Sequence, residues 1–285
     1  MPTKVTVGIS IYNNEKTIKY AIDSILKQTY NDWELILIDD GSTDNSLDII
    51  RTYNDERIKV YTDGENKGLI TRLNQMINLC QTDFFFRMDS DDIMHPERIE
   101  KQVKFLLNNK DIDLVGAEAI VVDEENKISG IRRNKNIVKS IRFVFENPVF
   151  IHPTVAGKTE WFKQHRYDNG FHRCEDFELW CRTIETSNFA HINEPLLFYR
   201  DPKKLNKTNY INSLKTSRKV IKKYENSKVY RFKFVIKSLI KENAFKTTIL
   251  LNLDKLWLKK RNKSYLTDQH VQNEYGDILQ GIINP

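Results

Sequence analysis

The chain has 285 residues, of which 40% are hydrophobic and 29% are charged, so it is long enough for one large domain and its composition argues against global disorder. Its three cysteines form no CxxC pair, which argues against a disulfide framework or a zinc knuckle and favours a reducing cytoplasm. No run of 18 apolar residues is present and residues 1–16 do not resemble a secretory signal, so we expect a cytoplasmic protein without a membrane-spanning helix.

Strand and helix patterns alternate over the first hundred residues. Runs rich in β-branched and aromatic residues predict strands at residues 4–12, 33–38, 57–61 and 83–88. Apolar residues at helical spacing predict helices between them, at residues 15–28, 46–53 and 69–79. Ser42–Asp44 is typical of a cap before the second of these helices. This rhythm indicates right-handed β-α-β units, so we expect an α/β fold with a mostly parallel sheet flanked by helices.

The middle of the chain is less regular. It carries strand patterns at residues 113–123, 150–157 and 189–199, and a helix pattern at residues 175–184 that begins with two acids. Near residues 201–206 the composition shifts to lysine, asparagine and tyrosine. This shift predicts a boundary between a body and a C-terminal extension.

Polar clusters follow three of the predicted strands. They are Tyr12–Asn14, Asp39–Ser42 and Asp89–Asp92. In a parallel sheet the carboxyl ends of the strands meet at one edge, and ligands collect beyond that edge. We therefore expect a ligand site where these three clusters come together.

The Asp89-Ser90-Asp91-Asp92 cluster places three carboxylates within four residues. Their mutual repulsion costs stability unless a cation compensates it, and carboxylate oxygens favour Mg²⁺ or Mn²⁺. An alternative is that Asp91 and Asp92 cap a helix that starts near Pro96. The four residues by themselves leave both interpretations open.

Two further acidic pairs have a functional and a local structural interpretation. Asp39 and Asp40 could accept hydrogen bonds from a nucleobase or a ribose, or could belong to a turn and a helix cap. Glu175 and Asp176 could supply a general base, or could lie at a helix start because the helix dipole favours acids there. Residues 64–68 (GENKG) form a weak candidate for a phosphate-side loop, and neither GxGxxG nor a P-loop is present.

Taken together and in order, these stretches resemble family 2 of the glycosyltransferases, an inverting family with the GT-A fold. The matching stretches are VGISIYNNEKTIKYAIDSILKQTYNDWELILIDDGSTDNS, NKGLITRLNQMI, FFFRMDSDDIMHPERIEKQ, HPTVAGKTEWF and EDFELWCR, which span roughly residues 4–200. The resemblance implies a GT-A catalytic domain at residues 1–202. Its nucleotide-binding half would be residues 1–100 and its acceptor-binding half residues 101–202, with a basic helical extension at residues 203–285.

The resemblance also implies roles for single residues. The positions that it assigns to the nucleotide sugar are Ser10, Tyr12, Asp39, Asp40, Gly68, Arg72, Arg87 and Asp89. Asp89 and Asp91 match the Asp-x-Asp motif that holds Mn²⁺ or Mg²⁺, and Asp176 matches the catalytic base. Glu175 and His152 are candidates for contact with the acceptor or the diphosphate, although His152 could equally pack beneath the sheet.

The function implied by the resemblance is a hexosyltransferase. It would move a hexose or N-acetylhexosamine from a UDP-sugar to a hydroxyl of a glycan or lipid-linked acceptor, in cell-surface polysaccharide, capsule or lipopolysaccharide synthesis. The Gln-x-x-Arg-Trp motif of processive synthases is absent, which favours a single addition. The alternative is a non-catalytic protein that binds a nucleotide sugar on the same fold, in which the acids would be only structural.

The C-terminal extension is strongly basic. Residues 203–263 contain 19 lysines and arginines against three acids, although the whole chain has a net charge of only +6. Apolar residues at helical spacing lie among these cations: Phe232, Val235, Ile236, Leu239 and Ile240, followed by Leu253, Leu256, Trp257 and Leu258 and the cluster Lys259–Arg261. This pattern predicts peripheral contact with the anionic inner face of the cell membrane. The alternative is that the apolar side packs on the catalytic domain; no motif for nucleic acid accompanies the charge, so no nucleic acid is expected.

Overall fold

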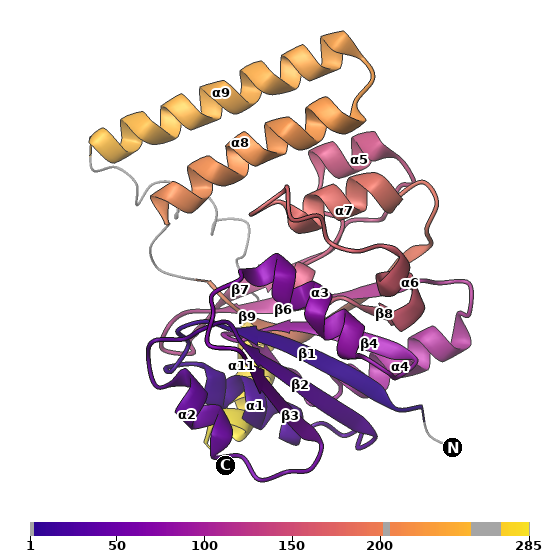
Figure 1. Cartoon of the computed structure of the whole chain (residues 1–285), viewed down its shortest axis with the longest axis vertical. Coiled ribbons are helices and arrows are strands. Elements are labelled where there is room, and N and C mark those ends of the chain that lie inside the picture. Colours follow the sequence, from indigo (N-terminus) through magenta and orange to yellow (C-terminus); the bar gives the residue numbers. More distant parts are fainter. Residues whose placement is uncertain (1–2, 202–205, 252–268, 285) are drawn as a thin grey trace.

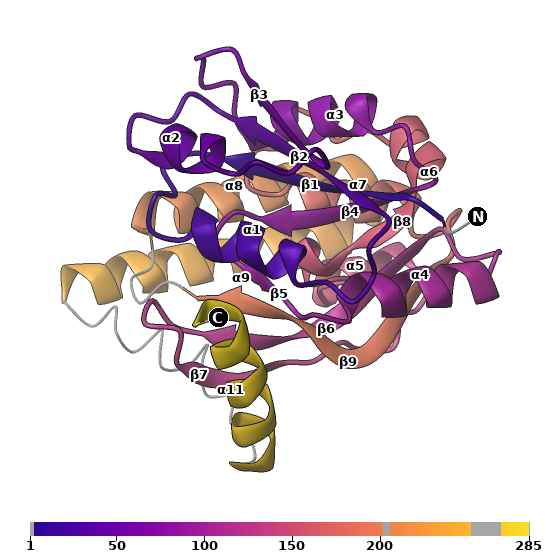
Figure 2. The same ribbon diagram turned by 90° about the horizontal axis from the view of Figure 1, so that it is seen from below.

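A computed structural model of the chain describes residues 3–201, 206–251 and 269–284 (Figure 1). Within these residues, nine strands form a single sheet with the order β3-β2-β1-β4-β8-β6-β9-β5, and β7 pairs with β6. Helices flank this sheet on both faces, as Figure 2 shows from below. The predicted α/β fold with a mostly parallel, helix-flanked sheet is therefore confirmed.

The N-terminal half contains the predicted strands and helices in the predicted order. They are β1 (Val5–Ile11), α1 (Ile18–Leu26), β2 (Trp33–Asp39), α2 (Ser46–Arg51), β3 (Ile58–Thr62), α3 (Leu69–Leu79) and β4 (Phe84–Asp89). All four strands are parallel, from β3 at the edge to β4. Every residue of β2 is buried, because helices cover both faces of the sheet and leave no side for polar alternation.

The second half extends the sheet with mixed pairing. Its elements are β5 (Ile93–Met94), α4 (Arg98–Asn108), β6 (Leu114–Val122), β7 (Ile128–Arg132), α5 (Ile141–Glu146), the 3-10 helix η1 (His152–Thr154), β8 (Ala156–Lys158), α6 (Thr159–Gln164), α7 (Glu175–Thr183) and β9 (Phe189–Arg200). Strand β8 runs antiparallel to both β4 and β6, and β9 runs parallel to β6. This half thereby places α7 beside the carboxyl end of β4, near the expected ligand site.

Two local predictions are wrong. The strand expected at residues 150–157 is a 3-10 turn followed by the short strand β8, because Pro153 fixes its own φ and cannot donate to a strand ladder. Asp91 and Asp92 do not cap α4, which begins at Arg98 after Glu97. The capping interpretation of the acidic cluster is thus excluded, and these carboxylates need another explanation.

Among the described residues after β9, three helices follow the sheet: α8 (Lys207–Tyr224), α9 (Lys228–Leu250) and α11 (Gln269–Ile283). Helices α8 and α9 form an antiparallel hairpin, and α8 lies over α5 and α7 (Figure 1). Helix α11 returns to the sheet, where Tyr275, Leu279 and Ile282 pack in one cluster with Ile93 and Phe198. The predicted boundary at residues 202/203 and the cluster Lys259–Arg261 lie outside the described residues, so the division into domains stays a prediction.

Helix α9 exposes some of its apolar residues and buries others. Phe232 and Ile240 are 65% and 63% exposed, and Ile236 and Leu239 are also exposed. The other side buries Ser238, Glu242 and Phe245, and Arg218 of α8 donates to the first two. Phe234 packs against the apolar cluster of the body that includes Trp180. Helix α9 therefore packs some of its apolar residues inward, as in the alternative, and leaves others exposed. Within the described part of the chain, no helix is both long and apolar enough to cross a membrane.

Candidate functional site

A cavity of about 960 Å³ opens beyond the carboxyl ends of β1, β2 and β4. Ser10 of β1 lies opposite Asp89 of β4 in the parallel register, which brings the two strand ends together. The predicted site residues that line the cavity are Ser10, Tyr12, Asp40, Gly68, Arg87, Asp89, Asp91, His152, Glu175 and Asp176. Asp39 and Arg72 do not line it.

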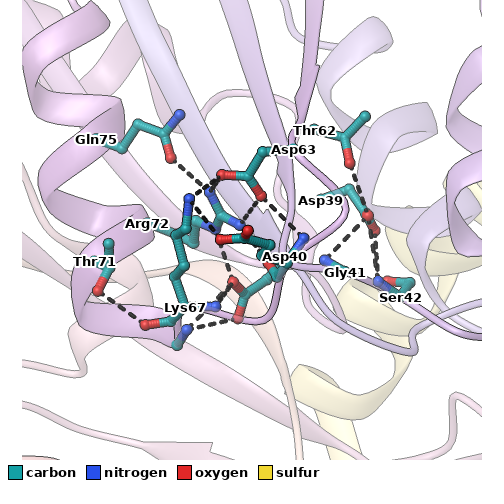
Figure 3. A network of polar contacts seen from close by, with 12 residues as sticks. Asp39, Asp40, Gly41, Ser42, Thr62, Asp63, Lys67, Thr71, Arg72 and Gln75 are labelled. Carbon is teal, nitrogen blue, oxygen red and sulfur yellow. Dashed lines mark hydrogen bonds and ion pairs between the residues drawn. The ribbon is translucent and has the colours of Figure 1, made fainter.

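Arg72 lies behind the cavity and holds Asp40 in position (Figure 3). Its Nε donates to Asp40 Oδ1 over 2.7 Å, and its two Nη atoms donate to the Asp63 carboxylate over 2.7 and 3.0 Å. The backbone N–H groups of Lys67 and Gly68 also donate to Asp40. Gly68 has a φ of 81°, a backbone conformation that favours glycine, so glycine suits the position from which this N–H donates. Asp40 is therefore a buried, charge-compensated acceptor at the cavity wall.

Asp39 has a local structural role. Its carboxylate accepts the N–H groups of Gly41 and Ser42 and the hydroxyl of Thr62, so it closes the turn after β2 (Figure 3). Gly41 has a φ of 72°, and a Cβ there would meet the backbone of Glu65 at 2.8 Å. The turn interpretation thus describes Asp39, and the ligand-facing interpretation fits Asp40.

The acidic cluster after β4 is compact. Carboxylate oxygens of Asp89, Asp91 and Asp92 all lie within 4.8 Å of one another. Asp92 is buried, and one of its oxygens accepts the N–H of Arg200 at 2.9 Å. Its other oxygen has no hydrogen-bond partner among the described residues. Sequence reasoning assigned the metal to Asp89 and Asp91, and the structure adds Asp92 to the same oxygen cluster.

Two arginines organise this cluster. Arg87 of β4 is buried and forms a bidentate ion pair with Asp89, in which Nη1 lies 2.9 Å from Oδ2. Arg200, at the end of β9, donates to the Asp91 carbonyl over 2.8 Å and to the carbonyl of Asp123. Arg200 was not predicted, because it is 109 positions from Asp91 and the pairing of β5 with β9 brings it there.

The charges of the cluster fit a divalent cation. Burial, and then repulsion by Asp89, raises the pKa of Asp91 to about 6. Burial, together with repulsion by Asp91 and Asp89, raises the pKa of Asp92 as well. Converging acids with an unpartnered buried oxygen are a donor set that a hard cation such as Mg²⁺ or Mn²⁺ would satisfy.

Glu175 and Asp176 open α7 at the opposite wall of the cavity. Their carboxylates lie in the first turn, where the helix dipole favours negative charge, and Asp176 Oδ1 accepts the N–H of Phe177 at 2.7 Å. Burial and repulsion by Asp176 raise the pKa of Glu175 to about 7. Burial also raises the pKa of Asp176, against the opposing effects of Phe177 and Arg87. An aspartate with a raised pKa is a stronger base than an exposed one.

His152 lines the cavity and is held by a tyrosine. Its Nε2 lies 2.9 Å from the hydroxyl oxygen of Tyr167. Burial, with the nearby Arg87 guanidinium, keeps the pKa of His152 well below its usual value, so the ring is neutral. The structure thus combines the two interpretations of the sequence: the ring reaches the cavity wall and is also packed, with Trp180 edge-on at 6.2 Å.

Three further arginines, Arg132, Arg133 and Arg173, line the cavity together with His172. Arg132 lies over the ring of Tyr199, with Cζ 3.9 Å from the ring centroid. Arg173 has a φ of 67°, which is rare for a residue with a side chain, and it lies two residues before the first acid of α7. These residues were not predicted; the only signal was two basic pairs inside the otherwise acidic body.

Comparison with known proteins places this geometry in a family. The sequence model described as glycosyl transferase family 2 matches residues 6–166. The O-antigen biosynthesis glycosyltransferase WbnJ of Escherichia coli is 34% identical over 205 residues, which cover 69% of this chain and 79% of WbnJ. The E. coli protein named UDP-Glc:alpha-D-GlcNAc-diphosphoundecaprenol beta-1,3-glucosyltransferase WfgD is 28% identical, over 66% of this chain and 73% of its own.

Solved structures share the fold at low sequence identity. TarS of S. aureus in complex with UDP-GlcNAc gives a TM-score of 0.61 at 16% identity, covering 98% of this chain and 81% of the TarS chain. The mannosyltransferase PcManGT of Pyrobaculum calidifontis, in complex with GDP-Man and Mn²⁺, gives 0.62 at 15% identity, covering 99% and 86%. These likenesses support the GT-A arrangement of the sheet and helices.

Proposed function

The chain belongs to glycosyl transferase family 2, and on that premise we propose that it transfers a hexose or N-acetylhexosamine from a UDP-sugar, with inversion, to a hydroxyl of a glycan or lipid-linked acceptor. The acceptor would be an intermediate of cell-surface polysaccharide or lipopolysaccharide synthesis, in line with the names of WbnJ and WfgD. The observation that carries the proposal is that Asp89 and Asp91 of the acidic cluster line the same cavity as Asp176.

The donor nucleotide would lie at the end of the cavity formed by β1, β2 and α3. Asp40 can accept the imide N–H of a uracil, and its network with Arg72 holds the carboxylate ready for that contact. The ring of Tyr12 is 48% exposed at this end and can stack on the base. Ser10 and the Gly68 segment border the same space and would face the nucleotide. Arg72 would act on the donor only through Asp40.

Asp176 would be the general base. As the acceptor oxygen forms its bond to the anomeric carbon, Asp176 takes the hydroxyl proton, and the bond from that carbon to the diphosphate oxygen breaks. The UDP leaves with that electron pair, and attack from the opposite face inverts the anomeric centre. Glu175 and His152 border the space where the acceptor or the diphosphate would lie. The helix dipole of α7 keeps the Asp176 carboxylate available for the proton.

The negative charge that develops on the leaving diphosphate must be compensated. Asp91 and Asp92, with Asp89, would hold Mn²⁺ or Mg²⁺, and a cation bound there would neutralise charge on the diphosphate. Arg173 lies on the cavity wall near the start of α7 and can add positive charge from this chain itself.

The proposal is tested by donor hydrolysis. We expect slow release of the nucleotide from one member of a panel of UDP- and GDP-sugars, which stops when EDTA removes the metal. Water replaces the acceptor in this assay, so the acceptor need not be known. If no sugar nucleotide is hydrolysed and none raises the melting temperature of the protein in the presence of Mn²⁺, the proposed function is wrong.

The α8–α9 hairpin would hold the enzyme at the inner face of the cell membrane. The outer side of α9 combines exposed apolar residues with the exposed lysines Lys233, Lys237 and Lys241. Apolar side chains enter the interface between headgroups and acyl chains, and each lysine near an anionic surface adds about 1 kcal/mol of attraction. The proposed membrane face therefore consists of this side of α9.

A vesicle assay tests the membrane face. We expect the double variant Phe232→Glu, Ile240→Glu to bind phosphatidylglycerol vesicles at least about tenfold more weakly than the wild type, because two exposed apolar side chains that would enter the bilayer become charged. Val138, which is 55% exposed outside the hairpin, gives the matched control Val138→Glu. Equal sedimentation of the double variant and the control with the vesicles would exclude this face.

A further inference from the structure

A second cavity lies between the catalytic body and the α8–α9 hairpin. This groove, of about 390 Å³, is large enough for a small ligand. Helices α5 and α7 contribute Val144, Phe145, Phe177 and Trp180, and the hairpin contributes Tyr210, Leu214 and Phe234. Figure 1 shows how α8 covers α5 and α7 and how α9 lies on the outer side of α8. The groove therefore exists only because the C-terminal extension packs on the body.

The wall of this groove is apolar, and several of its polar atoms are already bonded. The Ser217 hydroxyl donates to the Leu214 carbonyl in its own helix, and the Ser213 hydroxyl donates to the Asn209 carbonyl. The Glu146 carboxylate accepts the hydroxyl of Tyr230 at 2.9 Å. A ligand in the groove would therefore meet mainly carbon, and a hydrocarbon matches such a wall better than a sugar or a peptide backbone.

The groove and the donor cavity meet at the proposed base. Asp176, Pro148 and Phe150 line both of them. Resting on the proposed function, we propose that this groove is the acceptor subsite for a hydrocarbon chain: the acceptor sugar presents its hydroxyl to Asp176, and the lipid attached to that sugar lies between α7 and the hairpin. The enzyme would thus be selective for an acceptor joined to a lipid over a free glycan.

The position of the hairpin supports a lipid as the occupant. Phe234 of α9 lines the groove, while Phe232 and Ile240 of the same helix are exposed on the proposed membrane face. One helix therefore borders the subsite and carries the surface that would touch the bilayer. The cations of the hairpin also suit an anionic lipid-linked molecule, because opposite charge concentrates it near the groove.

Chain-length dependence of binding tests the subsite. The probes are hexyl, octyl and decyl β-glucosides, titrated below their micelle concentrations into the full chain by calorimetry. We expect the Kd to fall about two- to fourfold for each added methylene while the chain stays in the groove. In Phe234→Ser, the Kd should change much less with chain length. Phe232→Ser, which changes the same residue type on the exposed side of the same helix, should retain it.

A second variant, which fills the groove, distinguishes loss of the subsite from misfolding. Leu214→Trp adds volume to the groove without adding charge, and it should weaken decyl β-glucoside binding at least about tenfold while far-ultraviolet circular dichroism stays that of the wild type. A Kd that does not change with chain length in the wild type, or a dependence lost equally in Phe232→Ser and Phe234→Ser, would overturn the proposal. The titration uses no nucleotide, so its failure is distinct from failure of donor hydrolysis.

Discussion

Replacing Asp176 with asparagine is expected to lower the rate of donor hydrolysis at saturating nucleotide sugar by about 10²- to 10⁴-fold. Asparagine has the same shape but cannot take up the proton of the attacking hydroxyl or water. The Kd of the nucleotide sugar should change less than about threefold, because the donor end of the cavity is built from β1, β2 and α3. The measurement is nucleotide release under single-turnover conditions, with donor affinity obtained by calorimetry.

Glu175→Gln is the matched control for this prediction. Glu175 is the preceding residue on α7 and lines the same cavity, but the proposed mechanism gives it no proton to take. Repulsion by the ionised Asp176 raises the pKa of Glu175 to about 7, so Glu175 takes up its proton first as the pH falls and is neutral where Asp176 titrates. The wild-type rate should fall with decreasing pH as the Asp176 carboxylate becomes protonated, and in Glu175→Gln this fall should stay at nearly the same pH. A larger loss of rate in Glu175→Gln than in Asp176→Asn would make Glu175 the base instead.

Asp91→Asn is expected to remove metal-dependent hydrolysis and, at the same time, to stabilise the metal-free protein. Loss of charge compensation at the diphosphate corresponds to several kcal/mol, or about 10²-fold or more in rate. The ordinary pKa of the carboxyl is 3.8 and the folded value is about 6, so the folded protein binds more protons than the unfolded chain between these values. The ionised carboxylate therefore lowers the free energy of unfolding as the pH rises through about 6.

Urea denaturation with EDTA at pH 8 measures the second effect. Asp91→Asn should raise the free energy of unfolding by about 1 kcal/mol there and leave it nearly unchanged at pH 4.5, where the wild-type carboxyl is largely protonated. Mn²⁺ should raise the melting temperature of the wild type at pH 8 and have little effect on the variant. Asp111→Asn, at an exposed position outside the cluster, is the control. A destabilised Asp91→Asn protein that keeps its response to Mn²⁺ would contradict the assignment of the cluster.

The sequence by itself determined the frame of this protein. The alternation of strand and helix patterns gave the order of the elements from β1 to β4, because periodicity and β-propensity are local properties. The polar ends of these strands indicated one site, since the carboxyl ends of parallel strands meet at one edge. Asp40 and Asp89 line one cavity for this reason. The prediction of a strand at residues 150–157 is wrong because Pro153 interrupts the apolar pattern.

Only the tertiary structure decided how neighbouring acids divide their roles. Asp39 and Asp40 are adjacent and look alike in the sequence, but Asp39 closes a turn and Asp40 faces the cavity because Arg72, 32 positions later, holds it there. Packing likewise joined Arg200 to Asp91 and formed the groove around Phe234. These contacts join residues that are far apart in the chain, so the types and the spacing of the side chains in the sequence do not predict them.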